Sequence, residues 1–279
     1  MYALSGKVVA ITGAGNGIGR ALALACATRG AQLALSDIKE EPLQETARLV
    51  EKLGGRAVIR LVDVAKRDEV EAWAAAAAAE LGGVDVIINN AGVALLDTLE
   101  DVPYEEFRWV FDILFWGVVH GTRAFLPQVR ARKGVVVNLG SIHSFIAAPN
   151  NGPYCAAKSA VRGFCDALRE EVRDAGVQVL LVMPGGIKTE IVRNSKVRKF
   201  INAGASQEDV HRAHNAASLT SPEQAARIIL DAVEARNPRQ LVGIDAVFYD
   251  GLTRLMPSLA HRLYAWGAKR MAVQRPARA

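Results

Sequence analysis

The sequence predicts an α/β protein: a single domain built on a doubly wound, Rossmann-type parallel sheet of about seven strands, with helices on both faces. Short apolar runs alternate with helical stretches along most of the 279 residues. These runs are apolar along their whole length, as in strands that are buried on both faces of a parallel sheet. A glycine-rich turn between the first run and the first helix is typical of dinucleotide-binding folds. The expected strands are KVVAIT, AQLALSD, RAVIRLVDV, VDVIINN, GVVVNLGS, VQVLLVMPG and RQLVGI.

Helices are expected between these strands, over residues 17–29, 40–53, 66–81, about 104–131 and about 153–175. Ser221-Pro222-Glu223-Gln224 predicts a further helix start, because serine caps, proline fits the first helical position and glutamine can return a hydrogen bond. The polar, irregular stretch from about 190 to 218 is expected to form a substrate lid. We therefore expect a dinucleotide-binding catalytic domain at 1–250, followed by a basic amphipathic extension at 251–279.

The formal charge of +5 is located mostly in the last part of the chain. From Gly251 onwards there are six Lys or Arg and no Asp or Glu, so the preceding residues are close to neutral. No basic stripe with a recognition motif indicates a nucleic-acid partner. No leader pattern and no apolar run of membrane-spanning length is found, which favours a cytoplasmic protein. Three cysteines without a CxxC pair, and His211 and His214 without companion ligands, predict neither disulfides nor a metal site.

The glycine-rich turn has the spacing GxxxGxG. Its glycines permit a tight turn and a close approach to a pyrophosphate, which the following helix N-terminus would bind. The second strand ends at Asp37, where a carboxylate can accept hydrogen bonds from ribose hydroxyls and would repel a 2′-phosphate. Asp37 therefore predicts NAD, unless it only caps a helix, which would leave the cofactor open. The loop residues expected to bind the cofactor are Gly13, Asn16, Gly17, Ile18 and Gly19.

Three side chains predict the chemistry. Ser141 ends the fifth expected strand, and Tyr154 and Lys158 follow with YxxxK spacing on one helix face. A lysine cation, together with the charge of an oxidised nicotinamide, would lower the pKa of the tyrosine towards neutrality and make it an acid and base. Ser141 would stabilise the charge that develops on a substrate oxygen.

Together, TGAGNGIG, Asp63-Val64, NNAG, Ser141 with YCAAK, and PGGIKT resemble the short-chain dehydrogenase/reductase family from about Gly6 to Gly243. The resemblance implies an NAD-dependent oxidoreductase that is a homodimer or homotetramer. It implies that Asp63 and Val64 hold the adenine and that Lys158 also binds the nicotinamide ribose. It further implies cofactor contacts from Asn90, Ala91, Gly92, Pro184, Gly185, Ile187 and Thr189.

Leu114 departs from the family pattern. In WVFDILFWGVVHGTRAFLP it occupies the position of an asparagine that, in the family, helps hold a water linking the lysine to solvent. Leucine offers no side-chain donor or acceptor. We therefore expect an enzyme with slowed proton exchange, unless water reaches Lys158 by another route. The alternative function is an NAD-binding scaffold or sensor with little turnover.

The expected substrate is a small molecule, a mainly apolar secondary alcohol or ketone. The residues expected to line its pocket are His143, Leu95, Phe145 and Ile191, with Leu96 and Ile146 as further candidates. The class of molecule stays open, because many lipids and aromatics would fit an apolar pocket.

The C-terminal extension has apolar residues at three- and four-residue steps, interrupted near a helix start at Pro257: Leu252, Leu255, Leu259, Leu263 and Trp266. Basic residues surround them. This pattern favours a helix packed on the body or on a second subunit. Reversible contact with an anionic membrane is the alternative.

Overall fold

The computed structural model describes residues 2–191, 195–197 and 206–273. Its centre is a seven-stranded sheet in the order β3-β2-β1-β4-β6-β7-β9, with every neighbouring pair parallel. The predicted doubly wound fold is thus confirmed. The strands are β1 (Val8–Thr12), β2 (Gln32–Asp37), β3 (Ala57–Leu61), β4 (Val86–Asn89), β6 (Val135–Leu139), β7 (Gln178–Pro184) and β9 (Arg239–Val242).

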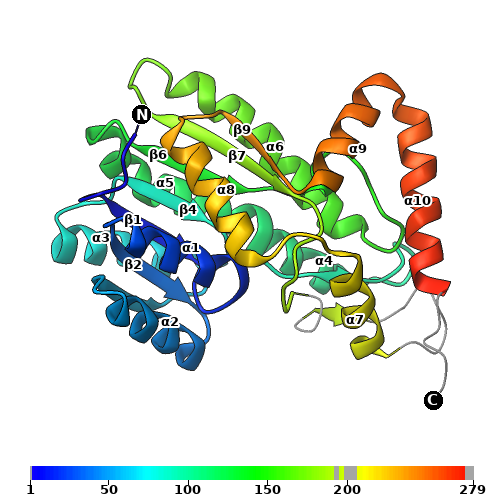
Figure 1. Ribbon diagram of the computed structural model, residues 1–279, viewed down its shortest axis with the longest axis horizontal. Helices are drawn as coiled ribbons and strands as arrows, with labels where there is room; N and C mark the ends of the chain where they lie inside the picture. Colours follow the sequence, from blue (N-terminus) through cyan, green and yellow to red (C-terminus); the bar gives the residue numbers. More distant parts are fainter. Residues whose placement is uncertain (1, 192–194, 198–205, 274–279) are drawn as a thin grey trace.

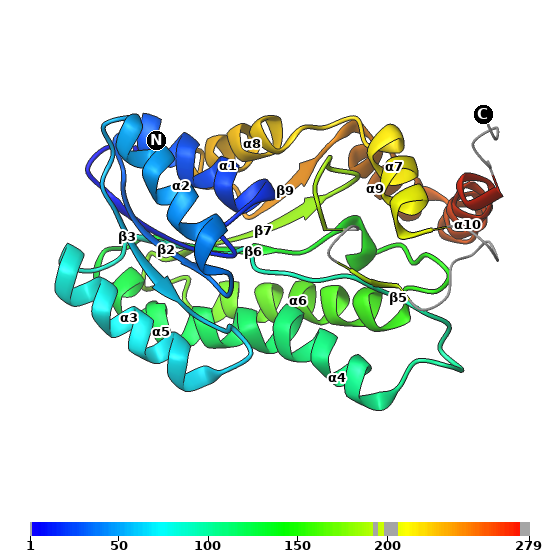
Figure 2. The same ribbon diagram turned by 90° about the horizontal axis from the view of Figure 1, so that it is seen from below.

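Helices cover both faces of the sheet (Figure 2). One face carries α1 (Gly17–Thr28), α2 (Glu40–Lys52) and α8 (Pro222–Glu234), and the other carries α3 (Arg67–Leu81), α5 (Gly117–Ala131) and α6 (Gly152–Glu171). Each face has its own apolar core, because the strands present apolar side chains to both sides. None of the helices in the described residues is long and apolar enough to cross a lipid bilayer.

The helix expected over 104–131 contains an interruption. It consists of α4 (Tyr104–Phe111), the π-helical turn η1 (Asp112–Trp116) and α5. A π turn inserts an extra residue into a helix and changes which side chains face its neighbours. Leu114 lies inside this turn, and its side chain is buried. Apolar spacing alone gives no sign of the insertion.

Helix α5 lies very close to the sheet at Gly121. A Cβ added there would overlap the side-chain oxygen of Asn89, whose amide nitrogen donates to Thr122 Oγ1 at 3.1 Å and to Asn138 Oδ1 at 2.8 Å. We expect Gly121→Ala to lower the free energy of unfolding by about 1–3 kcal/mol, because a close-packed contact must open. Urea denaturation followed by circular dichroism measures this change.

Gly163→Ala is the matched control, because Gly163 lies in α6 with no atom within 4 Å of an added Cβ. Alanine there should leave stability unchanged or raise it by up to about 1 kcal/mol, since glycine is the poorer helix former. Equal effects of the two substitutions would contradict the close approach of α5 to Asn89.

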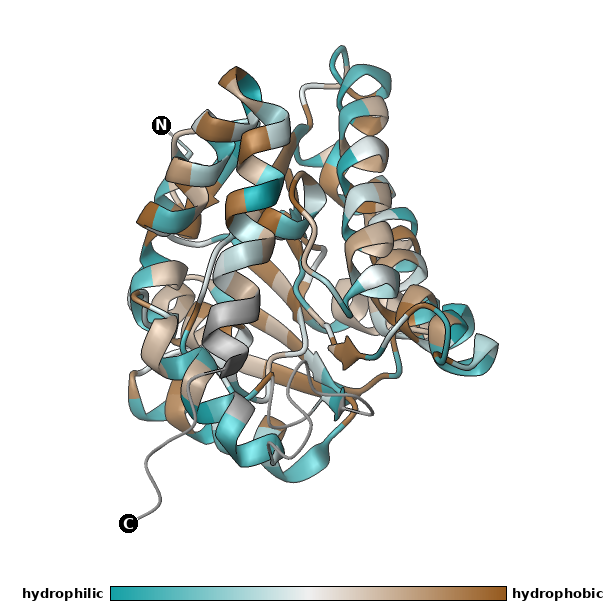
Figure 3. Cartoon of the chain, turned by 90° about the vertical axis from the view of Figure 1, so that its right-hand side faces the viewer, coloured by the Kyte–Doolittle hydropathy of each residue, from teal (hydrophilic) through white to brown (hydrophobic). Residues whose placement is uncertain are grey.

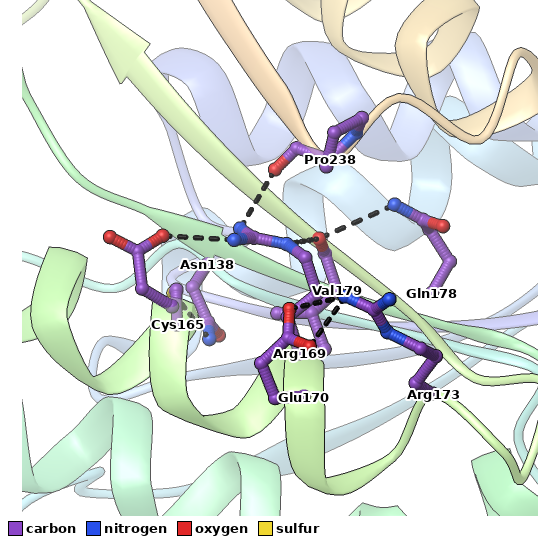
Figure 4. Close-up of polar contacts among 9 residues, drawn as sticks. Asn138, Cys165, Arg169, Glu170, Arg173, Gln178, Val179 and Pro238 are labelled. Atoms are coloured by element: carbon purple, nitrogen blue, oxygen red, sulfur yellow. Dashed lines mark hydrogen bonds and ion pairs between the residues drawn. The ribbon is translucent and has the colours of Figure 1, made fainter.

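Helix α6, which carries Tyr154 and Lys158, is fastened to the sheet by polar contacts at its C-terminal half (Figure 4). Arg169 donates to the carbonyl oxygens of Val179 at 3.4 Å and Pro238 at 3.1 Å, which belong to β7 and the turn before β9. Asn138 of β6 donates to Cys165 Sγ at 3.2 Å. These bonds fix the position of α6 along the sheet.

The C-terminal part forms a hairpin of two helices beyond the carboxyl ends of the strands, at the right in Figure 1. Helix α9 (Ile244–Leu255) follows β9 directly, and α10 (Pro257–Val273) begins at the expected Pro257. Residue 250, the expected domain boundary, therefore lies inside α9. Ala246 and Ala260 of the hairpin pack on Ile142 and Ile146 of the loop after β6, so the hairpin is attached to the catalytic part.

The expected lid contains regular structure. Strand β8 (Lys196–Val197) pairs with β5 (Leu95–Leu96), and α7 (Gln207–Ala217) follows. Residues 192–194 and 198–205 of the lid lie outside the described residues. Helix α8 begins as predicted, with Gln224 N donating to Ser221 Oγ at 3.2 Å and Ser221 N donating to Gln224 Oε1 at 3.0 Å.

Candidate active site

The glycine loop after β1 packs tightly against the segment after β4. Gly13 has a φ of +65°, and a Cβ added to it would lie 2.8 Å from Ala91 Cα. A Cβ on Gly19 would overlap the carbonyl oxygen of Gly13. Side chains are therefore excluded from both positions. Gly17, which also has a positive φ, begins α1 and has no side chain to cover its backbone.

Asn90 and Ala91 hold this loop in place. The Asn90 amide donates to the carbonyl oxygens of Thr12 at 2.9 Å and Gly13 at 3.1 Å. In return, Thr12 Oγ1 accepts hydrogen bonds from Asn90 N at 2.9 Å and Ala91 N at 3.0 Å. Asn90 thus supports the expected cofactor site by shaping the glycine loop. Thr12, which the sequence analysis did not single out, is its partner.

Asp37 lies at the end of β2 beside the loop. Its Oδ2 accepts a hydrogen bond from Gly15 N at 2.8 Å and its Oδ1 accepts one from Lys39 N at 3.0 Å. Each carboxylate oxygen has a further lone pair, so Asp37 can also accept from a ribose hydroxyl. Arg20 lies behind the loop and donates to Thr46 Oγ1 at 3.0 Å. The bare glycine backbone and the carboxylate at the strand end fit an adenine dinucleotide.

Asp63 and Val64 follow β3 in a turn that packs on α5. Asp63 Oδ1 accepts a hydrogen bond from Ala65 N at 3.0 Å, and Val64 O contacts His120 Nδ1 at 3.0 Å. A Cβ on Gly117 would lie 2.9 Å from Val64 Cγ2, so the helix approaches this turn closely. The turn expected to hold the adenine is thus supported from behind by α5.

Ser141, Tyr154 and Lys158 come together at the carboxyl end of β6. Ser141 caps the short 3-10 helix η2 (Ile142–Ser144), where its Oγ accepts a hydrogen bond from His143 N at 3.2 Å. Lys158 Nζ lies 5.8 Å from the centroid of the Tyr154 ring and donates to Leu139 O at 2.6 Å. Both Ser141 and Lys158 are buried.

Burial dominates the titration of this group. It raises the pKa of Tyr154 to about 12, against the opposing effect of a hydrogen bond with Ser141. It lowers the pKa of Lys158 to about 8, because the ammonium is removed from water. The predicted lowering of the Tyr154 pKa by Lys158 and an oxidised nicotinamide together applies to the cofactor-bound protein. In the protein alone, burial has the largest effect on the Tyr154 pKa, and the hydrogen bond with Ser141 opposes it.

Ser144 connects the loop that carries Ser141 to helix α6. Its Oγ donates to Lys158 O at 2.9 Å and accepts from Ser141 N at 3.3 Å. The loop that carries Ser141 is therefore tied to the turn of α6 that carries Lys158. The capping pattern of serines at positions 141 and 144 was the signal that could have identified this residue.

Leu114 packs near Tyr154 on α6, the helix that also carries Lys158. It belongs to an apolar cluster with Leu95, Val110 and Ala157, against which Tyr154 also packs. Its side chain is 1% exposed, and a Cβ on Gly92 would lie 3.3 Å from its Cδ2. The position expected to help a proton relay is thus filled by apolar atoms.

His143 lies next to Tyr154, and Tyr264 lies next to His143. The His143 ring meets the rings of Tyr154 and Tyr264 edge-on, each with a centroid distance of 5.7 Å. Burial lowers the pKa of His143, and its Nδ1 lies 3.0 Å from Ile146 O, so a neutral ring donating from Nδ1 fits this environment. Of the other expected pocket residues, Leu95 is fully buried in the Leu114 cluster, whereas Phe145 and Ile191 are partly buried.

The loop from Pro184 to Thr189 is held from several sides. Asp245 Oδ2, at the start of α9, accepts a hydrogen bond from Gly186 N at 2.7 Å, and a Cβ on Gly185 would overlap its carboxylate. Lys188 N donates to Thr220 O at 3.0 Å. The Thr189 side chain lies near Gly17, with its Cγ2 3.5 Å from an added Cβ. The loop therefore closes over the glycine loop, as expected for the nicotinamide end of a dinucleotide site.

Comparison with known proteins identifies the family. The family model described as short chain dehydrogenase matches residues 7–199, which cover the glycine loop, Ser141, Tyr154 and Lys158. The chain belongs to the short-chain dehydrogenase/reductase family.

Its relatives in this family are oxidoreductases. A Mycobacterium tuberculosis protein named "Putative oxidoreductase SadH" is 43% identical over 96% of this chain and 97% of its own. An 11-beta-hydroxysteroid dehydrogenase-like protein of Arabidopsis thaliana is 34% identical over 98% of this chain and 79% of its own. A crystal structure of a family member from Burkholderia phymatum in complex with NAD is 29% identical, with a TM-score of 0.83, covering 93% of this chain and 96% of that one.

Two site residues that sequence reasoning missed lie beyond the part matched by the short-chain dehydrogenase model. Asp245 and Tyr264 belong to the C-terminal hairpin, where no motif marks them. The sequence signal available for Asp245 was an acidic residue two positions after a glycine, Gly243. In the structure this glycine has a φ of +102°. Tyr264 had none, because its contact with His143 depends on how α10 folds back. Among the described residues, no group of three or more His, Cys, Asp or Glu could hold a metal ion.

Proposed function

We propose that this oxidoreductase uses NAD and transfers a hydride between the nicotinamide and a mainly apolar secondary alcohol or ketone. The observation that supports this most directly is the grouping of buried Ser141 and Lys158 with partly buried Tyr154. A partly buried phenol that is hydrogen-bonded to Ser141 is suited to exchanging one proton with one substrate oxygen.

Each residue has a separate role. Tyr154 gives its phenol proton to a ketone oxygen or, in the reverse direction, takes the proton of an alcohol as the phenolate. Ser141 donates a hydrogen bond to the same oxygen and stabilises its partial negative charge. Lys158 presents a buried positive charge behind the tyrosine and can bind the nicotinamide ribose. When bound, NAD supplies the carbon that accepts the hydride and the positive charge of its nicotinamide ring.

The preference for NAD rests on Asp37. Its carboxylate at the end of β2 favours ribose hydroxyls and repels a 2′-phosphate, and Asn16 provides no opposing positive charge. The rest of the binding site would be formed by Gly13, Gly17, Gly19, Asp63, Val64, Ile187 and Thr189. The neighbouring structure from Burkholderia phymatum contains NAD, which supports this choice.

The experiment that tests the proposal is an absorbance assay at the wavelength of reduced nicotinamide. A panel of secondary alcohols and ketones is offered with NAD and, separately, with NADP. We expect turnover of apolar substrates and a higher kcat/KM with NAD. Single-turnover hydride transfer that is absent for the whole panel, despite tight NAD binding, would favour the alternative of a scaffold or sensor, for which Leu114 is the motivation.

Leu114→Asn should raise kcat severalfold, because an amide at this position can hold a water that connects Lys158 to solvent. The substitution places a polar group among Leu95, Val110 and Ala157, so we also expect a loss of stability of about 1–3 kcal/mol. Steady-state rates across a pH series measure the effect. Leu114→Met, which stays apolar, should leave kcat near that of the parent.

An unchanged kcat and an unchanged pH profile in folded Leu114→Asn would show that proton exchange does not limit this enzyme. Thermal melting of both variants separates a loss of folded protein from a true change in rate.

A further inference from the structure

The C-terminal hairpin carries an unusual share of exposed apolar surface. Eight of the sixteen exposed large apolar side chains in the described residues belong to α9, α10 and the turn between them. Seven of these make up what we call the hairpin surface: Ile244, Val247, Phe248, Leu255, Met256, Leu259 and Leu263. Monomeric soluble proteins rarely expose so many apolar side chains together unless a partner covers them.

These side chains are not the ones that attach the hairpin to the body. Ala260 is buried and Tyr264 is partly buried, and both pack on the cluster after β6. Leu252, which was expected to continue the stripe, packs on the same cluster. Leu255, by contrast, is 83% exposed. Figure 3 views this side with α10 in front, where brown apolar segments alternate with teal polar ones.

The sequence of α10 contains basic residues and no acidic ones. Arg262 is exposed on α10, and Lys269 and Arg270 follow in the same helix. The two acidic residues of the hairpin are engaged elsewhere: Asp245 accepts from Gly186 N, and Asp250 pairs with Arg239 and with Arg254 Nε at 3.1 Å. No Asp or Glu follows residue 250 in the sequence. The hairpin surface therefore belongs to a part of the chain in which basic residues are in excess.

We propose that the hairpin surface docks reversibly on an anionic lipid bilayer. Apolar side chains on a helix that lies in the interface enter the acyl region, while basic side chains pair with lipid phosphates. A second copy of the chain fits less well. A two-fold contact would bring the same basic residues of both copies together without acidic partners.

The docked orientation would bring the substrate side of the protein near the lipid. Tyr264, on the inner side of α10, contacts His143, which in turn contacts Tyr154. The membrane and the catalytic tyrosine would thus be separated mainly by one helix. This consequence depends on the proposed function, whereas the docking itself does not.

Flotation of the full chain with vesicles tests the proposal. Vesicles of phosphatidylcholine alone are compared with vesicles that also contain phosphatidylglycerol, at low and high salt. We expect binding to the anionic vesicles that weakens as salt screens the basic residues. Arg262→Gln/Lys269→Gln/Arg270→Gln should weaken it on the order of a hundredfold, since each charge near an anionic surface contributes about fivefold.

Leu255→Glu/Leu263→Glu should abolish vesicle binding, because it replaces two apolar side chains of the hairpin surface by charged ones. Leu53→Glu/Ile59→Glu is the matched control, because it changes two exposed apolar residues, one at the C-cap of α2 and one in β3. These elements lie at the end of the molecule away from α10 (Figure 2), so this variant should bind like the parent. Thermal melting verifies that each variant is folded.

Equal and negligible flotation with both kinds of vesicle would overturn the proposal, as would undiminished binding of Leu255→Glu/Leu263→Glu. A dimer in analytical ultracentrifugation that dissociates on the same substitutions, without any vesicle binding, would assign the hairpin surface to a second copy instead.

Discussion

Tyr154→Phe is expected to lower kcat/KM on the order of a thousandfold while leaving NAD binding nearly unchanged. In the proposed mechanism, removing the phenol oxygen removes the proton that Tyr154 exchanges with the substrate, and positioned acid–base groups contribute about 10²–10⁴-fold to catalysis. The ring itself would remain, so its packing against the Leu114 cluster and the edge of His143 should persist. Steady-state rates and fluorescence titration with NAD measure the two effects separately.

Tyr104→Phe provides the control for this substitution, because Tyr104 is exposed at the start of α4 and far from the catalytic group along the chain. It should retain the parent rate. If Tyr154→Phe kept more than about a tenth of the parent kcat/KM, another group would have to supply the proton, and the proposed role of Tyr154 would be lost.

Lys158→Met is expected to abolish turnover and, at neutral pH, to make the fold more stable. A pKa lowered from 10.5 to about 8 means that the buried ammonium destabilises the folded state by about 3 kcal/mol. The substitution removes this penalty but leaves Leu139 O without its donor, at about 1–2 kcal/mol. We therefore expect a net gain of about 1–2 kcal/mol at pH 7, measured by urea denaturation.

The stability gain from Lys158→Met depends on pH. Below pH 8 the lysine is protonated in both states, so the parent bears the full penalty. Between pH 8 and 10.5 the folded parent holds fewer protons than the unfolded chain, so its stability rises with pH. The advantage of Lys158→Met should shrink over this range.

Lys52→Met, at the exposed end of α2, should change stability by no more than about 0.5 kcal/mol at either pH. A Lys158→Met variant that is less stable than the parent at pH 7 would mean that burial of the ammonium carries no net penalty.

The sequence predicted the sheet well because its strands are apolar on both faces. Val86, Ile87 and Ile88 are each fully buried, and this is the feature that separates a doubly wound sheet from an antiparallel one. The π turn at Asp112–Trp116 could not be predicted, because it differs from the α-helix around it in its hydrogen bonding and not in its residue types. The pairing of β5 with β8 was also missed, because two-residue strands have no periodicity.

Residues of the site were predictable where they share a local spacing. Tyr154 and Lys158 lie one helical turn apart, so their proximity follows from the helix itself. Spacing says nothing about burial, however, and burial has the largest effect on the pKa values of both groups in the protein alone. Contacts such as Tyr264 with His143 join distant parts of the chain, and only the folded hairpin brings them together.

Asp245 limits how freely this protein could be recombined with its relatives. The hairpin looks like an exchangeable module that could be grafted to change substrate preference, yet its first helix turn carries the carboxylate that accepts from Gly186 N. A chimaera joined after Val242 would inherit a foreign residue next to the loop from Pro184 to Thr189. Grafts that keep an aspartate at this position should retain affinity for the dinucleotide. Grafts that lack it should bind the dinucleotide more weakly, whatever substrate preference they bring.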